Sequence, residues 1–214
     1  MYEKYGQFTD GKWHKSSNGE TYEVINPANE EVLGQASKAS PEDVNKALLS
    51  AQKGLEVWRK TPPWQRAYIL RRIADKMREK QDILAKWMTL EVGKPFAEAK
   101  GEVNGAADIY EWNAEETKRI YGQTVESRFE DTRVHVYYQP VGVVAALVPW
   151  NFPLVLSARK ISTALAAGCS VIVKPDVITP GVVMEQVEIC RECGVPPGVV
   201  NLLSGDPPSI AQQL

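Results

Sequence analysis

Residues that bind metals or form disulfides are scarce in this sequence. Its 214 residues include three cysteines, Cys169, Cys190 and Cys193, and two histidines, His14 and His135. An odd number of cysteines does not indicate a disulfide framework. Cys190 and Cys193 form a lone C-x-x-C pair, and the sequence holds no second Cys/His pair to complete a zinc site. We therefore expect no metal site, no catalytic role for these residues, and a reduced, cytoplasmic protein.

Long apolar runs and a large excess of one charge are also missing. The longest apolar run, near residues 141–149, is far too short to span a bilayer. The first residues, Met1 to Gly6, lack the apolar centre of a signal peptide. A formal net charge of -2 gives no electrostatic reason to expect nucleic acid or an anionic membrane. We therefore expect neither of them as a partner.

Turn and helix signals organise the first part of the chain. Residues 5–35 carry the turn residues of an extended, β-rich segment. Ser40 and Pro41 mark a helix start, because serine can cap a helix and proline fits its first position. The apolar stripe that follows reaches Trp58 at helical spacing.

Further helical stripes follow two proline signals. Pro62-Pro63 ends the first helix and starts a second, whose single apolar stripe reaches Met88 and which Gly93 stops. A third helix is expected over 96–119. After it, residues 132–138 alternate like a strand with two different faces.

From Val141 the pattern is that of a parallel α/β sheet. The apolar strands are continuous rather than alternating, which indicates that both faces of the sheet are covered. Pro153 and Pro180 stand where first helical residues belong, and Thr179 is expected to cap the second of these helices. The expected elements are strands 143–148, 170–174 and 199–203, and helices near 153–167 and 180–193.

Two polar residues stand where strand ends meet helix starts, and ligands of open parallel sheets bind at that edge. The first is Asn151, in the turn from Pro149 to Pro153, whose side-chain amide can donate a hydrogen bond to a developing oxyanion. The alternative is that Asn151 only caps the helix. The second is Lys174, which follows a fully apolar strand and can bind a nucleotide ribose or phosphate. Its alternative is a solvated strand end.

Seven short motifs follow one another along the chain. They are Asn26-Pro27, Trp58, Glu91-Val-Gly-Lys-Pro95, Pro149-Trp-Asn-Phe-Pro153, Lys160, Ala166-Ala-Gly-Cys-Ser-Val-Ile-Val-Lys-Pro175 and Gly194-Val-Pro-Pro-Gly-Val-Val-Asn201. In order and spacing they resemble the aldehyde dehydrogenase superfamily over essentially the whole chain. The resemblance implies an α/β fold with a Rossmann-type cofactor domain, built on a parallel sheet and lacking G-x-G-x-x-G. It places the NAD(P)-binding domain at 1–121 and 141–214, and a β arm for oligomerisation at 122–140.

The resemblance assigns catalytic and substrate contacts to three residues. Asn151 would be the oxyanion-hole amide that holds the aldehyde oxygen as a thiol attacks, and Lys160 would lie near the active-site channel. Succinic-semialdehyde-type members carry Arg-Lys at this point, and their arginine, here Arg159, meets the substrate carboxylate. A planar guanidinium suits a carboxylate. The alternative for Arg159 is a solvated helix arginine with no ligand.

The cofactor implied by the resemblance is NAD or NADP. Lys174 would hydrogen-bond the adenosine ribose, and Gly205 would belong to the loop beside the pyrophosphate. The residues expected to line the cofactor cleft are Val148, Pro149, Trp150 and Asn151.

Two departures from the family pattern concern this cofactor. Members that use NAD commonly have a glutamate three residues after the strand lysine, where this chain has Val177. Losing that carboxylate removes repulsion against a 2′-phosphate, while Asp176 next to it restores repulsion, so both cofactors stay open. Pro207 stands where a second glycine is usual and is expected to alter pyrophosphate binding, because proline lacks an N–H.

The largest departure is that the family's nucleophilic cysteine and general-base glutamate would lie beyond residue 214. We therefore expect a fragment without the catalytic domain, inactive alone, whose last residues stop just inside a new helix. The expected function is the N-terminal cofactor-binding part of an NAD(P)-dependent aldehyde dehydrogenase. Its substrate would be an aldehyde such as succinic or another acid semialdehyde, oxidised to a carboxylic acid by a homo-oligomeric parent. The alternative is a truncated, non-catalytic homologue that acts as a nucleotide-binding or oligomerisation module.

Overall fold

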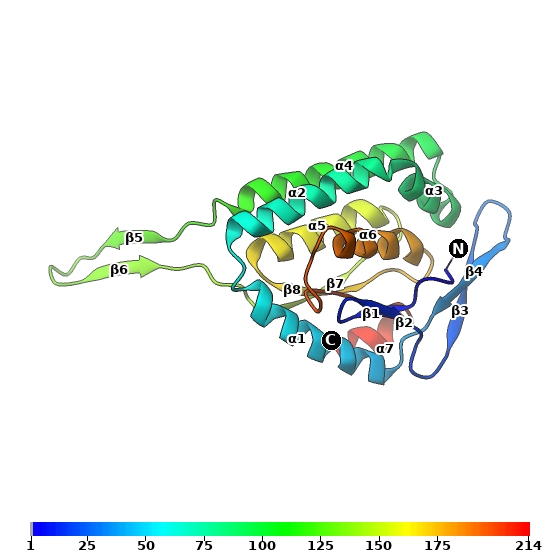
Figure 1. Ribbon diagram of the computed structural model, residues 1–214, viewed down its shortest axis with the longest axis horizontal. Coiled ribbons are helices and arrows are strands. Elements are labelled where there is room, and N and C mark those ends of the chain that lie inside the picture. Colours follow the sequence, from blue (N-terminus) through cyan, green and yellow to red (C-terminus); the bar gives the residue numbers. More distant parts are fainter. Residues whose placement is uncertain (1) are drawn as a thin grey trace.

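A five-stranded sheet forms the centre of the molecule in the computed structural model, which describes residues 2–214 (Figure 1). Its strands are β1 (Gln7–Thr9), β2 (Lys12–His14), β7 (Val143–Leu147), β8 (Ser170–Lys174) and β9 (Val200–Leu202), in the order β2-β1-β9-β8-β7. The strands β7, β8 and β9 run parallel, as the continuous apolar runs predict. β1 joins β9 antiparallel through Phe8 and Leu202, a pairing that the sequence analysis did not predict.

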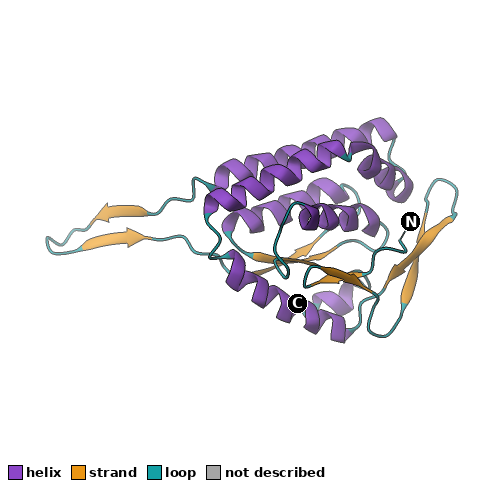
Figure 2. Cartoon of the chain, in the orientation of Figure 1, coloured by secondary structure: helices purple, strands orange, loops and turns teal. Residues whose placement is uncertain are grey.

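Helices cover both faces of this sheet (Figure 2). One face carries α1 (Pro41–Trp58) and the short α7 (Pro207–Ala211), and the other carries α5 (Pro153–Ala167) and α6 (Pro180–Glu192). An outer layer of α2 (Pro63–Glu79), α3 (Gln81–Val92) and α4 (Phe96–Thr117) packs on α5 and α6. The mixed α/β architecture expected from the sequence is therefore present.

The single helix expected between Pro63 and Gly93 is wrong, because the chain turns at Lys80. Lys80 leaves the helical conformation, with φ -94 and ψ 19. Its ammonium lies 3.1 Å from Glu185 and 3.0 Å from Glu192, both on α6. The turn lets α3 pack on α4 and α6 while α2 packs on α4 and α5. The apolar stripe continues through the break, so periodicity alone does not reveal it.

The start of α1 is fixed by a fully buried carboxylate. Ser40 caps the helix, as the serine signal predicts, and Asp43 completes a reciprocal capping box with it. Asp43 also accepts hydrogen bonds from the Ser16 hydroxyl at 2.8 Å and the Ser17 hydroxyl at 2.6 Å. The helix start is thereby tied to a loop from the N-terminal segment.

Two β ribbons lie outside the central sheet. The ribbon of β3 (Thr21–Ile25) and β4 (Val32–Ser37) belongs to the β-rich segment expected over 5–35. The ribbon of β5 (Gln123–Glu126) and β6 (Arg133–Val136) projects far from the body (Figure 1). Its exposed aromatic side chains include Phe129 and Tyr137.

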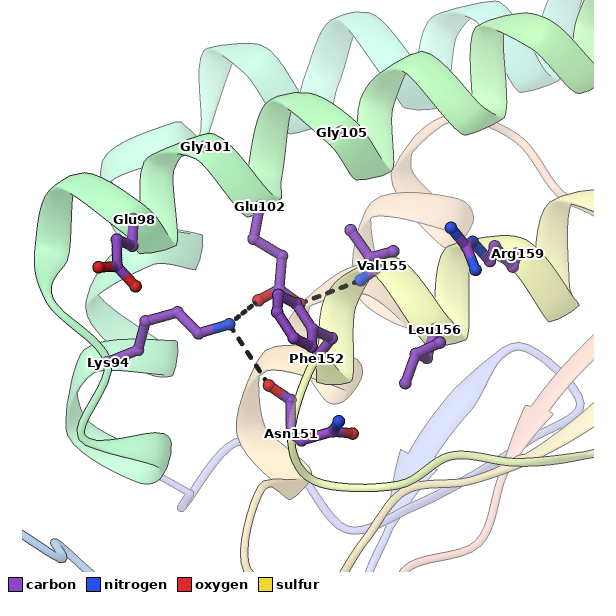
Figure 3. Close-up of a pocket in the computed structure, with 10 residues that line it drawn as sticks. All are labelled: Lys94, Glu98, Gly101, Glu102, Gly105, Asn151, Phe152, Val155, Leu156 and Arg159. Atoms are coloured by element: carbon purple, nitrogen blue, oxygen red, sulfur yellow. Dashed lines mark hydrogen bonds and ion pairs between the residues drawn. The ribbon is translucent and has the colours of Figure 1, made fainter.

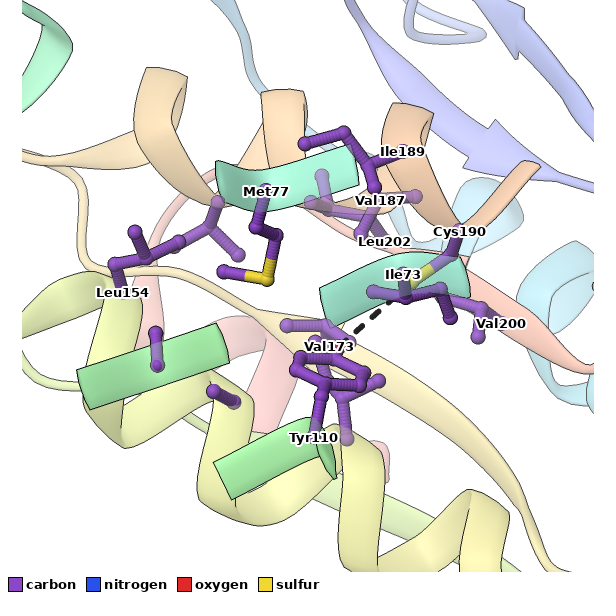
Figure 4. Close-up of a cluster of buried hydrophobic side chains, with 14 of the residues drawn as sticks. Ile73, Met77, Tyr110, Leu154, Val173, Val187, Ile189, Cys190, Val200 and Leu202 are labelled. Carbon is purple, nitrogen blue, oxygen red and sulfur yellow. Dashed lines mark hydrogen bonds between the residues drawn. The ribbon is translucent and has the colours of Figure 1, made fainter. Parts of the chain in front are cut away.

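The main core lies between the sheet and the inner and outer helices (Figure 4). Met77, Tyr110 and Leu154 are fully buried there, and the Tyr110 hydroxyl lies 3.8 Å from the Cys190 sulfur. Burial raises the pKa of the Cys190 thiol to about 12, and it also raises the pKa of Cys193. The C-x-x-C pair thus packs in the core, as inert buried cysteines do. Residues 2–214 contain no cluster of possible metal ligands and no helix long and apolar enough to cross a membrane.

Candidate functional site

The carboxyl ends of β7 and β8 meet at the edge where the sequence predicts a nucleotide site. Leu147 of β7 pairs with Lys174 of β8, and the Val148 amide donates to the Lys174 carbonyl at 2.9 Å. A cavity of about 260 Å³, here called the edge cavity, opens beside them. It is lined by Leu147, Val148, Pro149, Lys174, Asp176, Pro207 and Ala211. Four residues expected to contact the cofactor therefore lie together.

Lys174 has an unusual environment for a lysine, because the residue is only 4% exposed. Its ammonium has no hydrogen-bond or ion-pair partner in the part of the chain that the structure describes. Burial lowers the pKa of Lys174, while the negative charges of Asp176 and Asp206 act in the opposite direction. The ammonium can therefore offer its donors to a ligand in the edge cavity.

The other residues expected near the cofactor differ in whether they border the edge cavity. Asp176 accepts a hydrogen bond from the Ile178 amide at 3.2 Å and so shapes the loop after β8. Gly205 is buried with φ +145, and a Cβ there would lie 2.9 Å from the Ala39 nitrogen, so only glycine fits. Val177 is half-buried and does not line the edge cavity.

The helix that follows Gly205 already has a negative cap. Asp206 is the N-cap of α7 and accepts a hydrogen bond from the Ser209 amide at 3.2 Å. Pro207 takes the first helical position and lines the edge cavity, where it has no amide N–H to donate. This helix start therefore offers few free amide N–H donors to a pyrophosphate, and it carries the negative charge of Asp206.

A second cavity, of about 480 Å³, lies between α4 and the start of α5 and is here called the turn cavity (Figure 3). It is lined by Lys94, Glu98, Gly101, Glu102, Gly105, Asn151, Phe152, Val155, Leu156 and Arg159. The turn from Pro149 to Pro153 separates the two cavities, since Pro149 lines one and Asn151 lines the other.

A buried ion pair holds this turn. Glu102 of α4 accepts hydrogen bonds from the amides of Leu154 at 3.0 Å and Val155 at 3.2 Å, and its other oxygen pairs with the Lys94 ammonium. Lys94 also donates to the Asn151 carbonyl at 3.4 Å and lies 3.9 Å from the centre of the Phe152 ring. Glu102 thus satisfies the first amides of α5 from another helix, which also suits the helix dipole.

Asn151 itself does not cap α5. The N-cap residue is Phe152, and no side chain of the first turn supplies a cap. The Asn151 amide is exposed and forms no hydrogen bond within residues 2–214, while its backbone carbonyl is held by Lys94. The capping alternative for Asn151 is therefore wrong, and the amide is available to a ligand.

Arg159 and Lys160 follow on α5 and point to different places. Arg159 lines the turn cavity, at the opposite end from Glu98 (Figure 3). Within the described residues it forms no ion pair. Lys160 is exposed and lines neither cavity, and Trp150 is 51% exposed beside the turn. Their expected roles stay predictions.

Two buried glutamates were missed by the sequence analysis, although they set the start of both inner helices. Glu102 serves α5, and Glu91 accepts hydrogen bonds from the amides of Gly181 at 2.7 Å and Val182 at 3.2 Å in α6. Burial raises the pKa of Glu91 to about 7 against these hydrogen bonds. Thr179 holds the N-cap position of α6, but its buried hydroxyl makes no hydrogen bond, so the expected Thr179 cap is wrong. The available signal was an acid on an apolar helix face, as for Glu102 beside Val103.

Known proteins are similar in sequence to nearly the whole chain. The sequence profile of the aldehyde dehydrogenase family matches residues 13–214. The succinate-semialdehyde dehydrogenase [NADP(+)] of Escherichia coli (strain K12) is 44% identical over 205 residues, which is 96% of this chain and 42% of that protein. The glutarate-semialdehyde dehydrogenase of Pseudomonas aeruginosa is 42% identical over 207 residues, or 97% of this chain and 43% of that protein.

The fold is also similar to that of a solved structure. The crystal structure of succinate-semialdehyde dehydrogenase from Burkholderia pseudomallei superposes with a TM-score of 0.96 at 40% identity. That match covers 98% of this chain and 43% of the solved chain. This chain thus spans about two fifths of the length of the proteins it matches.

Proposed function

Because the chain belongs to the aldehyde dehydrogenase family, we propose that it binds NAD or NADP in the edge cavity and serves the oxidation of an aldehyde to a carboxylic acid. The observation that carries this proposal is Lys174, a residue only 4% exposed whose ammonium borders the edge cavity without a partner in residues 2–214. A buried charge is costly unless it is paired or hydrogen-bonded. Ribose hydroxyls would accept its hydrogen bonds, and the bound nicotinamide supplies the hydride acceptor.

Both cofactors belong to this proposal. The related enzyme of Escherichia coli is named for NADP(+). Val177 places no carboxylate against a 2′-phosphate, whereas Asp176 and Asp206 act on Lys174 from close by. The absence of a carboxylate at Val177 favours NADP, and the negative charges of Asp176 and Asp206 favour NAD.

The Asn151 amide stabilises the aldehyde oxygen in this proposal. Addition of a nucleophile to the aldehyde carbon places negative charge on that oxygen, and a preorganised amide lowers the barrier by roughly 3–4 kcal/mol. Lys94 and Glu102 hold the turn while leaving the Asn151 amide free. Cys169, Cys190 and Cys193 are all buried, so the thiol would come from outside residues 1–214.

Arg159 contributes substrate selection. The two related enzymes named above act on succinate semialdehyde and glutarate semialdehyde, and both of these aldehydes carry a carboxylate. Arg159 is an unpaired cation of the turn cavity within the described residues, and it shares that cavity with Asn151. A guanidinium at this point would bind the remote carboxylate while Asn151 holds the aldehyde end.

Turnover of matched aldehydes tests this assignment. Succinate semialdehyde and the neutral butanal are compared by NAD(P)H formation in a protein that joins residues 1–214 to the part that supplies the thiol. With Arg159→Leu, the KM for succinate semialdehyde is expected to rise about tenfold or more, a loss of about 1.4 kcal/mol. The KM for butanal stays the same, and so do both values in the control Arg72→Leu, which removes an exposed arginine of α2. Equal KM changes for both aldehydes would remove Arg159 from substrate recognition.

We also propose that the β5–β6 ribbon mediates self-association. The ribbon leaves the body and exposes Val125, Phe129 and Val134 along its length. Exposed apolar surface of this kind marks protein contacts. Light scattering of the chain with 122–140 replaced by a short Gly-Ser linker is expected to give a lower mass than the intact chain. An unchanged mass would show that the ribbon does not hold copies together.

A further inference from the structure

A third cavity lies at the root of the β5–β6 ribbon, and every charged side chain that lines it is basic. The cavity measures about 410 Å³ and is here called the arm-root cavity. It lies where the α1–α2 connection passes beside the base of the ribbon (Figure 1). The basic residues are Arg59, Lys60 and Arg66. Arg59 is paired with Glu56 at 3.6 Å, while Lys60 and Arg66 have no acidic partner in residues 2–214.

Arg66 is the unusual member of this group, because it is only 7% exposed. One terminal nitrogen donates to the Thr61 carbonyl at 2.7 Å, and the buried Nε has no acceptor. Burial lowers the pKa of Arg66, while Cys169 acts in the opposite direction. A buried guanidinium that lacks a carboxylate is costly, and an anion is the partner that would offset this cost.

The neighbouring helix ends supply no carboxylate to Arg66. The first turn of α2 begins with Pro62 and Pro63, contains no acidic residue and has no side-chain cap, so it adds partial positive charge. The C-terminal end of α5 lies close to Arg66, since a Cβ on Gly168 would be 3.4 Å from the guanidinium. The partial negative charge of that helix end offsets part of the guanidinium charge, and the Leu165 carbonyl there is already bonded by the Trp58 indole.

We propose that the arm-root cavity binds a phosphate group, either free or carried by a small organic molecule. Arg66 and Lys60 would contact the phosphate oxygens, and the positive end of α2 would add to the attraction. The cavity is larger than one phosphate, and Ile120, Pro140 and the Tyr138 ring form an apolar wall that suits an organic part. Nothing in this site depends on the edge cavity or the turn cavity.

Calorimetric titration of the 214-residue chain tests the proposal with inorganic phosphate and phenyl phosphate, at an ionic strength matched with chloride. Lys60→Gln is expected to weaken phosphate binding about fivefold, because it removes one positive charge from the site. Lys60 is exposed, so its loss does not threaten the fold. Arg66→Met is expected to abolish binding, and the control Lys53→Gln on α1 to leave it unchanged. Tighter binding of phenyl phosphate than of inorganic phosphate would identify an organic ligand, and equal binding a free anion.

Two outcomes would overturn the proposal. One is phosphate binding that Lys60→Gln and Lys53→Gln affect equally. The other is phosphate binding that is lost in Lys174→Met, because the phosphate would then occupy the edge cavity. A protein that fails to bind NAD or NADP but still binds phosphate through Lys60 would reject the proposed function while supporting this site.

Discussion

At the scale of single residues, the Glu102 carboxylate decides how the candidate site is held. It caps α5 through two amides and is compensated by Lys94. We predict that Glu102→Gln lowers the free energy of unfolding by about 1–3 kcal/mol, because a neutral amide is a weaker acceptor and leaves Lys94 unpaired. Urea unfolding followed by tryptophan fluorescence measures this loss.

Glu98 provides the matched control for that substitution. It lines the same cavity from the same helix, but it is exposed. Glu98→Gln is expected to change stability by less than about 0.5 kcal/mol. Equal effects of the two substitutions would show that the cap on α5 contributes nothing of its own.

Residue positions were predictable where they follow from place along the chain. Asn151 and Lys174 follow the ends of β7 and β8, so the carboxyl edge of the parallel sheet carries both, although they line different cavities. Glu102 was not predictable in this way, because the amides it binds lie 52 and 53 residues further along the chain. Periodicity identifies the buried face of α4 but does not identify its polar partner.

At the scale of elements, the contact between α1 and the loop before β9 requires a glycine. A Cβ on Gly54 would lie 2.1 Å from the carbonyl carbon of Gly198, which is backbone and cannot rotate away. We predict that Gly54→Ala destabilises the protein by about 1–3 kcal/mol through overpacking, despite the better helix propensity of alanine. Thermal unfolding measures the change.

The exposed Gly101 of α4 tests the propensity effect alone. A Cβ there would meet no atom within 4 Å. Gly101→Ala is therefore expected to stabilise the protein by about 0.5–1 kcal/mol. If both substitutions stabilise, the close approach of α1 to Gly198 is not a constraint.

Elements were predictable where local signals agree with packing. Proline signals place the starts of α1, α5 and α6 correctly, and at α1 the Ser40 capping signal agrees with them. The break at Lys80 was missed because the apolar stripe is continuous across it, and the turn depends on ion pairs with α6. The joining of β1 to β9 was missed because strand pairing across such a sequence separation has no local signal.

At the scale of the whole molecule, Asp43 links the N-terminal segment to α1, and this link depends on pH. Burial alone would raise the pKa of Asp43, but hydrogen bonds from Ser17, Ser40 and Ser16 outweigh it and hold that pKa below its ordinary value. The stabilisation is therefore present above the unfolded pKa of about 4 and is lost as the pH falls through the lower folded pKa.

Asp43→Asn is expected to show this dependence. At neutral pH the substitution lowers the free energy of unfolding by about 1–2 kcal/mol, because it weakens the capping box. The difference from the unaltered protein narrows as the pH falls below about 4, because Asp43 of the unaltered protein then gains a proton first in its unfolded state. Denaturant unfolding at several pH values measures the difference, and a gap independent of pH would exclude the Asp43 charge as its cause.

The central claim is that the edge cavity binds a nicotinamide dinucleotide through Lys174, and calorimetric titration with NAD and NADP tests it most directly. The account predicts binding of at least one cofactor by the 214-residue chain. Lys174→Met should weaken that binding about tenfold or more, and Lys86→Met, on the exposed side of α3, should leave it unchanged. Binding that is equally strong in Lys174→Met and in Lys86→Met would contradict the account, as would the absence of binding in the unaltered chain.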